Sequence, residues 1–518
     1  MATAFIDDDF VALRRMPEPR ARRVLTLAFG DEVELLERRD GWTRLRAVNV
    51  FDGTAEGWVK GNPPLRESGV LKLSMVDVQQ GDGLLLETPG GQIVLIDGGD
   101  NKLFARHLAE RFRHRRSSAA QPLEVAAIIV THGDADHFSG LDHIVASEAL
   151  DGDDARKRLF LKPLRLFHNG LVKGPDRLSD EEIFGRTVVV GDQRYIVDLH
   201  DDPGSVAPEA MNGPFRRWMA TLDHWRQRGP IACRRVAHGM DEAELFDFLA
   251  AEGIDVELFG PFDEAVPAPD ARGLRFLHKP SPAAEIHLEQ GDGGGALSAS
   301  HTINGHSIAF RLSYGAVRIN FTGDMNHESM ALLRHRMAPA ALEAEIVKVP
   351  HHGSHEFDLD ALKAMRPVVG IISSGDEHAG KEYIHPRATL MAAIGMAVRG
   401  RTGLVFNTEL AAFFAVRDLS FTCKDLAGFF SDHATRQFTG KQVADLISGK
   451  AHETGFPRPH FGFERTNFGI IHVRTDGERV LVFTHSGKDG LNEAYRFSVT
   501  RNAEGERSVR FARKVKTR

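Results

Sequence analysis

The sequence is poor in cysteine and contains no long apolar run. Only Cys233 and Cys423 occur among 518 residues, which excludes a disulfide framework and any zinc site built from several thiolates. A membrane-spanning helix needs about 18 or more consecutive apolar residues, and no such stretch is present. The N-terminal MATAFIDDDF is acidic where a signal peptide needs basic residues and then an apolar run. We therefore expect a cytoplasmic protein with no membrane segment.

The chain also lacks an excess of basic residues. The formal net charge is -7 and the sequence pI is about 6.4, which excludes a protein that coats nucleic acid uniformly but not one with a local basic surface. Hydrophobic residues make up 42% and charged residues 26%, the balance of a globular protein. A chain of this length is expected to divide into two or more domains.

Histidine, in contrast, is abundant, with 25 residues. Several of them lie in short polar stretches that directly follow apolar ones. Histidine is the commonest metal ligand and a general acid or base near neutral pH. These stretches are therefore the first candidates for a functional site.

The N-terminal region reads as a small β-module. From about residue 20 to 65, short apolar runs alternate with Gly- and Asp-containing turns, a pattern typical of a small barrel. It resembles a bacterial SH3-like domain. Trp42 and Trp58 either line a peptide groove, which would give the module a protein or peptide partner, or belong to its core. The stiff Asn-Pro-Pro at 62–64 marks the boundary of a module covering residues 1–66, and we expect a protein beginning at Glu67 to fold without it.

The rest of the chain predicts an α/β architecture. Strand-like alternation begins at about residue 70, followed by an amphipathic helix and the apolar strand VAAIIV at 125–130. A strand, helix and strand of this kind suggest a layered sandwich. We predict a main domain over residues 67–415 and a C-terminal α+β extension over residues 416–518, packed on the main domain.

Four potential ligands directly follow the apolar strand 125–130. They are His132, Asp134, Asp136 and His137, in the sequence THGDADH. Alternate residues of an extended loop project to the same side, and the ends of buried strands are where α/β proteins build their sites. Imidazoles and carboxylates are the groups that zinc or manganese requires.

Two later strand ends carry the same residue types. Asp324 follows the apolar segment RINF, and His351 and His352 follow EIVKVP. A strand-terminal aspartate alone is usually a turn former. Three strand ends with ligand residues in this order are a stronger indication of one shared metal site.

The order HxDxDH, GD and HHG resembles the metallo-β-lactamase superfamily, and most of all the hydrolase domain of the ComEC competence type. VDVQQGD at 76–82, IDGG at 96–99 and KVPHHGS at 348–354 strengthen the resemblance, which covers roughly residues 70–415. It implies a four-layer αββα sandwich with a site for two divalent metal ions, zinc or manganese.

The resemblance also implies how the ligands divide. His132 and Asp134 would bind the first ion, Asp136 and His137 the second, and Asp324 would bridge both. The histidine of the second site would be His352, with His351 as the fallback. Asp97 would orient the ligand loop by hydrogen bonds.

One ligand of the family's middle motif stays open. This chain has His301, Asn304 and His306 in that region. We favour His306 because it immediately precedes the strand, whereas ComEC-type domains often have asparagine in this motif.

The resemblance implies a binuclear hydrolase in which two ions activate a bridging hydroxide. Asp136 would orient the attacking water as well as bind metal, and His385 would either contact the substrate or be an ordinary loop histidine. Because Asp134 replaces an imidazole by a hard carboxylate, phosphodiester hydrolysis, with DNA or RNA as substrate, is the leading prediction. The alternatives are a hydrolase of amide, ester or thioester bonds and a binding or scaffold protein with a degenerate metal site.

Overall fold

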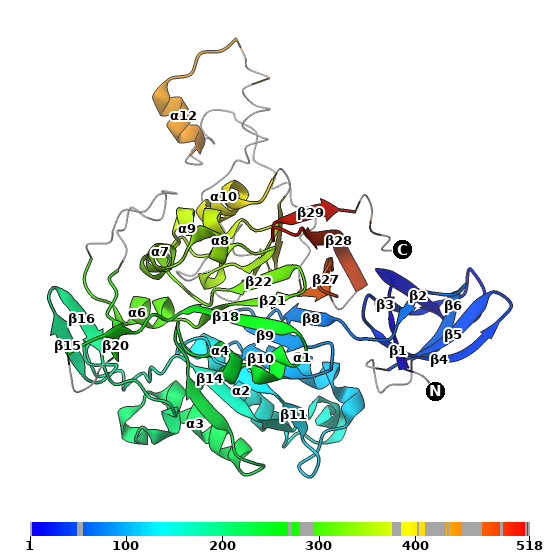
Figure 1. Ribbon diagram of the computed structural model, residues 1–518, viewed down its shortest axis with the longest axis horizontal. Coiled ribbons are helices and arrows are strands. Elements are labelled where there is room, and N and C mark those ends of the chain that lie inside the picture. Colours follow the sequence, from blue (N-terminus) through cyan, green and yellow to red (C-terminus); the bar gives the residue numbers. More distant parts are fainter. Residues whose placement is uncertain are drawn as a thin grey trace.

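Two large β-sheets and a separate N-terminal sheet organise the chain (Figure 1). The architecture comes from a computed structural model, which describes residues 3–48, 55–267, 272–279, 295–375, 385–400, 403–409, 431, 435–447, 469–486, 490–512 and 515. Among the helices in these ranges, none is both long and apolar enough to span a membrane.

The N-terminal module is an antiparallel seven-stranded sheet in the order β3-β2-β6-β5-β4-β1-β7. Asp40 and Gly41, both with positive φ, form the tight turn between β4 and β5, as expected for an Asp-Gly hairpin. In the described residues no pairing joins β3 to β7, so the sheet is a half-barrel and not the closed barrel that the sequence predicts. The strands are β1 (Thr3–Ile6), β2 (Phe10–Arg14), β3 (Arg23–Ala28), β4 (Glu32–Arg39), β5 (Trp42–Ala47), β6 (Glu56–Lys60) and β7 (Leu65–Arg66).

The two tryptophans of this module are packed side chains. Trp42 and Trp58 are 9% and 7% exposed, and the guanidinium of Arg39 lies 4.7 Å from the centroid of the Trp58 ring. Such cation–π packing covers the aromatic face. These contacts give no support to a peptide groove built on the two rings.

The first large sheet has ten strands in the order β17-β14-β12-β10-β9-β8-β26-β27-β28-β29. Its centre is buried on both faces, which explains why β9 and β10 read as nearly continuous apolar runs; in β8 the alternating Lys72 and Ser74 are buried as well. Its strands are β8 (Leu71–Met75), β9 (Gly83–Glu87), β10 (Ile93–Asp97), β12 (Ala127–Ile129), β14 (Arg165–His168), β17 (Ala232–Arg235), β26 (Ile470–Thr475), β27 (Arg479–Ser486), β28 (Gly490–Arg501) and β29 (Arg507–Phe511).

The second large sheet has six strands in the order β18-β21-β22-β23-β24-β25. From β22 to β25 neighbouring strands are parallel, so their carboxyl ends share one edge. The strands are β18 (Ile254–Gly260), β21 (Ala309–Tyr314), β22 (Val317–Phe321), β23 (Ile346–Lys348), β24 (Val369–Ile372) and β25 (Leu404–Asn407).

The two large sheets share one apolar core, to which both contribute buried side chains such as Leu73, Ile96, Ile319 and Ile371. A second core lies between the ten-stranded sheet and the helices α1 (Leu103–Arg111), α2 (Ala135–Ser147) and α3 (Gly213–Arg226). A third lies between the six-stranded sheet and α7 (His327–Arg336), α9 (Leu359–Met365) and α10 (Ala388–Ala397). Helices therefore cover the outer faces of two facing sheets.

Shorter elements connect these layers. They are β11 (Leu123–Val125), β13 (Leu161–Pro163), β15 (Thr187–Val190), β16 (Gln193–Ile196), β19 (Glu264–Ala265), β20 (Arg272–Arg275), α4 (Glu242–Leu245), α5 (Asp247–Ala250), α6 (Ala299–Gly305), α8 (Pro339–Leu342) and α12 (Gly440–Ile447).

The C-terminal strands belong to the ten-stranded sheet. Strand β26 pairs antiparallel with β8 from Ile471–Met75 to Thr475–Leu71, and β27 to β29 continue the sheet outward. The C-terminal segment, expected to pack on the main domain, thus extends its sheet by backbone hydrogen bonds in the described residues.

The N-terminal module docks on these C-terminal strands. Phe29, fully buried, packs with Val70, Leu481 and Phe483 in one apolar cluster. The guanidinium of Arg479 lies 3.7 Å from the centroid of the Phe29 ring. The N-terminal module therefore contacts the C-terminal strands through a packed interface.

Candidate metal centre

Strand ends from both large sheets bring the candidate ligands together. Strand β10 ends at Asp97 and β12 leads into the 132–137 loop, while β22 leads to Asp324 and β23 to His352. In the parallel parts of these sheets the carboxyl ends of the strands meet at one edge, which is where open α/β sheets build their sites.

Three imidazoles and one carboxylate converge at this edge. The Oδ2 atom of Asp324 lies 3.3 Å from Nε2 of His137 and 3.0 Å from Nε2 of His352. The ring centroids of His132 and His137 are 4.0 Å apart. All four side chains are buried, so their polar atoms need partners inside the protein.

Two groups of three ligand atoms open onto this space. One consists of His132, His137 and Asp324, and the other of Asp136, His137 and His352; within each group the ligand atoms lie within 4.8 Å of one another. Imidazole nitrogens and carboxylate oxygens at this separation suit zinc or manganese.

The geometry of His132 fits a metal ligand. Its Nδ1 lies 3.2 Å from the hydroxyl of Thr131 and 3.3 Å from that of Ser307. Its Nε2 is buried and has no hydrogen-bond partner among the described residues. A buried nitrogen without a partner costs about 1–3 kcal/mol, a cost that an ion bound at Nε2 would remove.

Asp97 fixes the orientation of His137. Nδ1 of His137 donates to Asp97 Oδ2 at 2.9 Å, and the backbone N–H and the hydroxyl of Thr131 also donate to this carboxylate, at 2.8 and 2.7 Å. With Nδ1 engaged, Nε2 faces Asp324. This is the geometry of a carboxylate that orients a metal-binding histidine.

Asp82 lies beside His352 in a similar position, at a longer distance. Its Oδ1 lies 3.4 Å from Nδ1 of His352, which leaves Nε2 facing Asp324. The neighbouring Gly81 lies directly against the backbone of the 132–137 loop. Only glycine fits there, because its φ is +90° and a Cβ atom would lie 1.7 Å from the carbonyl oxygen of Asp136. The Gly-Asp pair of the VDVQQGD motif thus has a physical reason.

His351 and His352 both adopt left-handed backbone conformations, with φ of 47° and 51°. Non-glycine residues occupy this region at a cost, and such strain is concentrated at functional sites. Both rings approach Asp324 Oδ2, His352 at 3.0 Å and His351 at 3.9 Å, and Nε2 of His351 also lies 3.4 Å from Nδ2 of Asn304.

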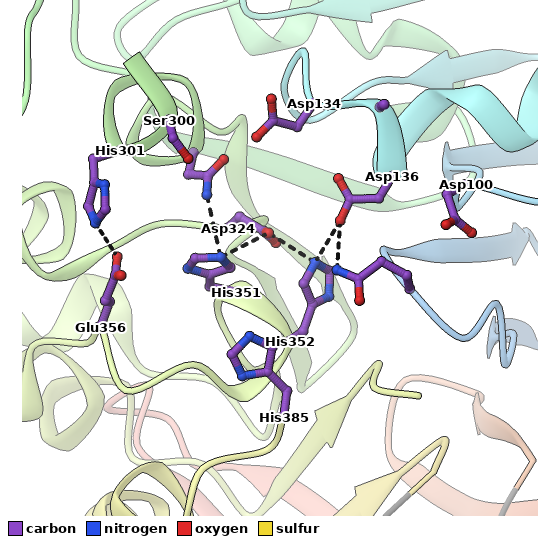
Figure 2. A pocket seen from close by; sticks show the side chains of 13 residues that line it. Asp100, Asp134, Asp136, Ser300, His301, Asp324, His351, His352, Glu356 and His385 are labelled. Carbon is purple, nitrogen blue, oxygen red and sulfur yellow. Dashed lines mark hydrogen bonds and ion pairs between the residues drawn. The ribbon is translucent and has the colours of Figure 1, made fainter. Parts of the chain in front are cut away.

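The two remaining carboxylates of the loop lie at the rim. Asp136 Oδ2 accepts from the side-chain amide of Gln80 at 3.1 Å and lies 3.8 Å from Nε2 of His352. Asp134 forms an ion pair with Lys173 at 3.0 Å and belongs to neither compact ligand group. Figure 2 shows Asp136 close to His352, and Asp134 farther from the histidines.

The structure does not bring His306 into the centre. Its Nε2 donates to the backbone carbonyl of Arg275 at 2.7 Å, so the ring is hydrogen-bonded to the end of β20 and not directed into the cavity. Asn304 faces the site instead, and its Oδ1 is buried without a hydrogen-bond partner in the described part of the chain. We therefore replace His306 by Asn304 among the candidate ligands.

Asp136, Asn304, Asp324 and His352 are among the residues that line an open cavity of about 430 Å³. On its far side Nε2 of His301 pairs with Glu356 at 2.9 Å, so His301 is engaged by a carboxylate (Figure 2). His385 also faces the cavity, with its ring centroid 5.9 Å from that of His351. The lining residues are Gln80, Asp100, Asp134, Ala135, Asp136, Ser300, His301, Asn304, Asp324, His351, His352, Glu356 and His385.

Burial and charge set the proton affinities in the centre. Burial lowers the pKa of His132 and of His385 well below the ordinary histidine value. Burial opposes protonation of His352 too, but Asp324 and Asp82 raise its pKa to about 9. Against its own burial, Asp324 has a pKa held well below the usual range by His352, His137 and Lys348. Without metal, His352 is therefore protonated near pH 7, and binding of a cation at its imidazole would release that proton.

Sequence reasoning missed three residues of this region. Asp82 was visible only as part of a motif, and Glu356 had no signal, because an isolated glutamate after a Gly-Ser turn is ordinary. Lys348 reads as a strand residue, yet it is 1% exposed and its ammonium lies between Asp82 and Asp324.

Comparison with known proteins gives one family match. Residues 76–149 match the model of the metallo-beta-lactamase superfamily, a segment that contains Asp82, Asp97 and the whole 132–137 loop. Among curated proteins, none matches this chain.

One of the similar solved structures is that of a long form RNase Z from yeast, with 9% sequence identity and a TM-score of 0.24. That similarity covers 82% of this chain and 49% of that one, so the chain spans about half of its length. At this level it supports no argument about fold or activity. The family match covers the region that carries the 132–137 loop: residues 76–149 are similar to the metallo-beta-lactamase superfamily.

Proposed function

We propose that this protein is a hydrolase that uses two divalent metal ions, and that its substrate is a phosphodiester. The observation that carries the proposal is the convergence of the His132, His137 and His352 imidazoles on Asp324. The superfamily match over residues 76–149 supports the same chemistry independently.

We assign the ligands from the two compact groups and their neighbours. His132, Asn304 and Asp324 would hold one ion, with Asp134 reaching it after release from Lys173. Asp136, His137 and His352 would hold the other, with Asp324 shared. Bound ions of this kind supply Lewis acidity toward an anionic oxygen and activate water near neutral pH.

The chain's own residues then position the reactants. Asp136 stands at the rim with one oxygen held by Gln80, where it can orient a water toward a substrate in the cavity. His385 lies across the cavity from Asp136, and burial keeps its imidazole neutral near pH 7. A neutral imidazole still donates one N–H, which suits contact with a phosphate oxygen or the leaving oxygen.

The lining contains carboxylates and histidines but, among its described residues, neither lysine nor arginine. An anionic phosphodiester would be repelled by this surface without bound cations. Metal should therefore be required for substrate binding as well as for turnover.

Two alternatives remain as competing hypotheses. A hydrolase of amide, ester or thioester bonds would use the same centre with a less anionic substrate. A scaffold protein with a degenerate site is disfavoured, because residues that follow three strand ends supply both compact ligand groups.

The test is a substrate screen with zinc- and manganese-loaded protein. We expect cleavage of bis(p-nitrophenyl) phosphate and of single-stranded DNA, faster with manganese, and little hydrolysis of a β-lactam or a thioester. His132→Ala should lose this activity together with at least one bound ion. His143→Ala is the matched control, since His143 is a half-exposed histidine of α2 that pairs only weakly with Asp142 at 3.8 Å.

Each result separates the hypotheses. Hydrolysis of the lactam or thioester without phosphodiester cleavage would favour the first alternative. A protein that binds no zinc or manganese after reconstitution would favour the scaffold.

A further inference from the structure

A buried lysine stands behind the metal centre. The Lys348 ammonium donates to the backbone carbonyl of Gly323 at 2.7 Å, pairs with Asp82 Oδ2 and lies 3.4 Å from Asp324 Oδ1. Lys348 is 1% exposed, Asp82 1% and Asp324 2%. Burying a charge is costly unless it is paired and hydrogen-bonded. This ammonium has three such partners, the Gly323 carbonyl and the carboxylates of Asp82 and Asp324.

The lysine divides the two oxygens of Asp324 between two tasks. Oδ1 faces the ammonium, whereas Oδ2 is the atom approached by His137 at 3.3 Å and by His352 at 3.0 Å. Rotation of the carboxylate would break the contact with Lys348. One defined oxygen of Asp324 is therefore presented to the cavity.

The same lysine acts on His352 through Asp82. Oδ2 of Asp82 pairs with Lys348, and Oδ1 lies 3.4 Å from Nδ1 of His352. The Lys348 ammonium thus holds the Asp82 carboxylate in place, and this carboxylate lies where it can orient the His352 imidazole. Side chains behind the ligands commonly change metal affinity by about 10–100-fold.

We infer that Lys348 is a positioning residue that presets Asp324 directly and His352 through Asp82 for two metal ions. This inference rests on the proposed function, because it concerns ligands of the proposed centre. In the proposed centre both ions share Asp324 and only the second is held by His352, so Lys348 supports both ions, and Asp82, through His352, supports one.

Coulomb's law and positioning predict opposite results when this lysine is removed. Loss of a positive charge beside carboxylates would by itself strengthen cation binding. Loss of positioning would weaken it. A weaker affinity in Lys348→Met would therefore identify positioning as the dominant effect.

The experiment is zinc titration of the full-length, metal-free protein in competition with a chromophoric chelator. We expect two ions in the wild type, at least a tenfold weaker affinity for both in Lys348→Met, and a similar loss for only one in Asp82→Asn. Lys348→Arg, which keeps the charge, should lie between wild type and Lys348→Met. Excess zinc should restore most of the activity of Lys348→Met, because its ligands are all present.

Lys72→Met is the matched control. Lys72 is also a buried lysine, at 8% exposed, but it lies on β8 among Glu87 and Arg111, away from the ligand groups. Removing it should change the melting temperature without changing zinc affinity. A merely structural role for Lys348 would give this same pattern.

Zinc binding in folded Lys348→Met that equals or exceeds the wild type would overturn this inference alone. If Lys348→Met does not fold, Asp82→Asn and Lys348→Arg decide, and two ions of wild-type affinity in both would overturn it equally. A wild type that takes up no zinc would overturn the proposed function, and the inference with it.

Discussion

The Asp97 carboxylate and the His137 imidazole form a buried pair, with 2.9 Å between Oδ2 and Nδ1. Both residues are fully buried, and two further hydrogen bonds from Thr131 hold the carboxylate in place. The pair joins the end of β10 to the start of α2. It sets which nitrogen of His137 is available to a metal ion, at a point where two elements of the fold meet.

Asp97→Asn should therefore weaken metal binding about 10–100-fold. The amide keeps the shape of the side chain, but it cannot accept from His137 and Thr131 as the carboxylate does. Chelator competition measures the change. Asp198→Asn, which removes a carboxylate that pairs with Arg186 at 2.8 Å, is the control. Unchanged metal affinity in Asp97→Asn would show that His137 needs no orienting partner.

Asn304 and His306 should respond differently to substitution. Asn304→Ala removes an amide that faces the cavity, so we expect weaker binding of one ion and loss of activity. His306→Gln should keep both ions, because this side chain bonds the Arg275 carbonyl and glutamine can still donate there. Metal content of the two purified variants distinguishes the assignments, and loss of an ion in His306→Gln would restore His306 as a ligand.

His168 should make stability depend on pH. Its Nδ1 accepts from the Gly170 N–H at 3.1 Å and its Nε2 donates to the Asp201 carbonyl at 2.9 Å. Protonation would remove the acceptor, and burial lowers the pKa to about 4 from 6.5.

Because the folded-state pKa lies below the unfolded one, this contribution is complete above pH 6.5 and is lost as the pH falls toward 4. It amounts to about 3 kcal/mol. His168→Gln keeps a donor and an acceptor without a titrating ring, so the wild type should lose more unfolding free energy than the variant between these pH values. Urea denaturation at pH 7 and at pH 4.5 measures it, and parallel losses in both proteins would contradict the assignment.

The N-terminal module should contribute to the stability of the whole chain. The sequence predicts that a protein beginning at Glu67 folds and stays active. The docked interface changes this expectation, because the truncation would expose Val70, Leu481 and Phe483. We now expect a lower melting temperature and a greater tendency to aggregate.

Phe29→Ala tests the same interface in the full-length protein. Removing a fully buried phenylalanine usually costs about 3–5 kcal/mol. Met16→Ala is the control, since Met16 is a half-exposed side chain of the same module. A truncated protein with the melting temperature of the full chain would show that the module is an independent domain.

Local patterns in the sequence were sufficient to predict the strand that precedes the 132–137 loop and the place of that loop at its end. His132, Asp136 and His137 follow the buried strand β12 directly. Asp324 and His352 follow β22 and β23, which are parallel neighbours, so these two residues lie at the same edge of their sheet. The loop that precedes β21 could not be predicted in this way. His306 and Asn304 are two residues apart, and only the capture of His306 by Arg275, a contact between segments distant in sequence, decides which one faces the cavity.

Long-range pairing was equally invisible in the sequence. Nothing in the run FGIIHVRTDG predicts that its strand joins β8, about 400 residues earlier in the chain. Apolar alternation identifies a strand but not its neighbour. The closed barrel was overpredicted for the same reason, because the pairing of its first and last strands cannot be read from the strands themselves.

The pairing of β26 with β8 has a consequence for the order of events during synthesis. Strand β8 is synthesised about 400 residues before β26, the strand that pairs with it. Until then β8 is an unpaired edge with buried-type side chains, the kind of surface that promotes association between nascent chains. Leu481 and Phe483, which the N-terminal module contacts, are also not yet synthesised during that interval. Completion of the fold therefore depends on synthesis of β26 and β27, and premature termination before residue 470 would leave both surfaces open.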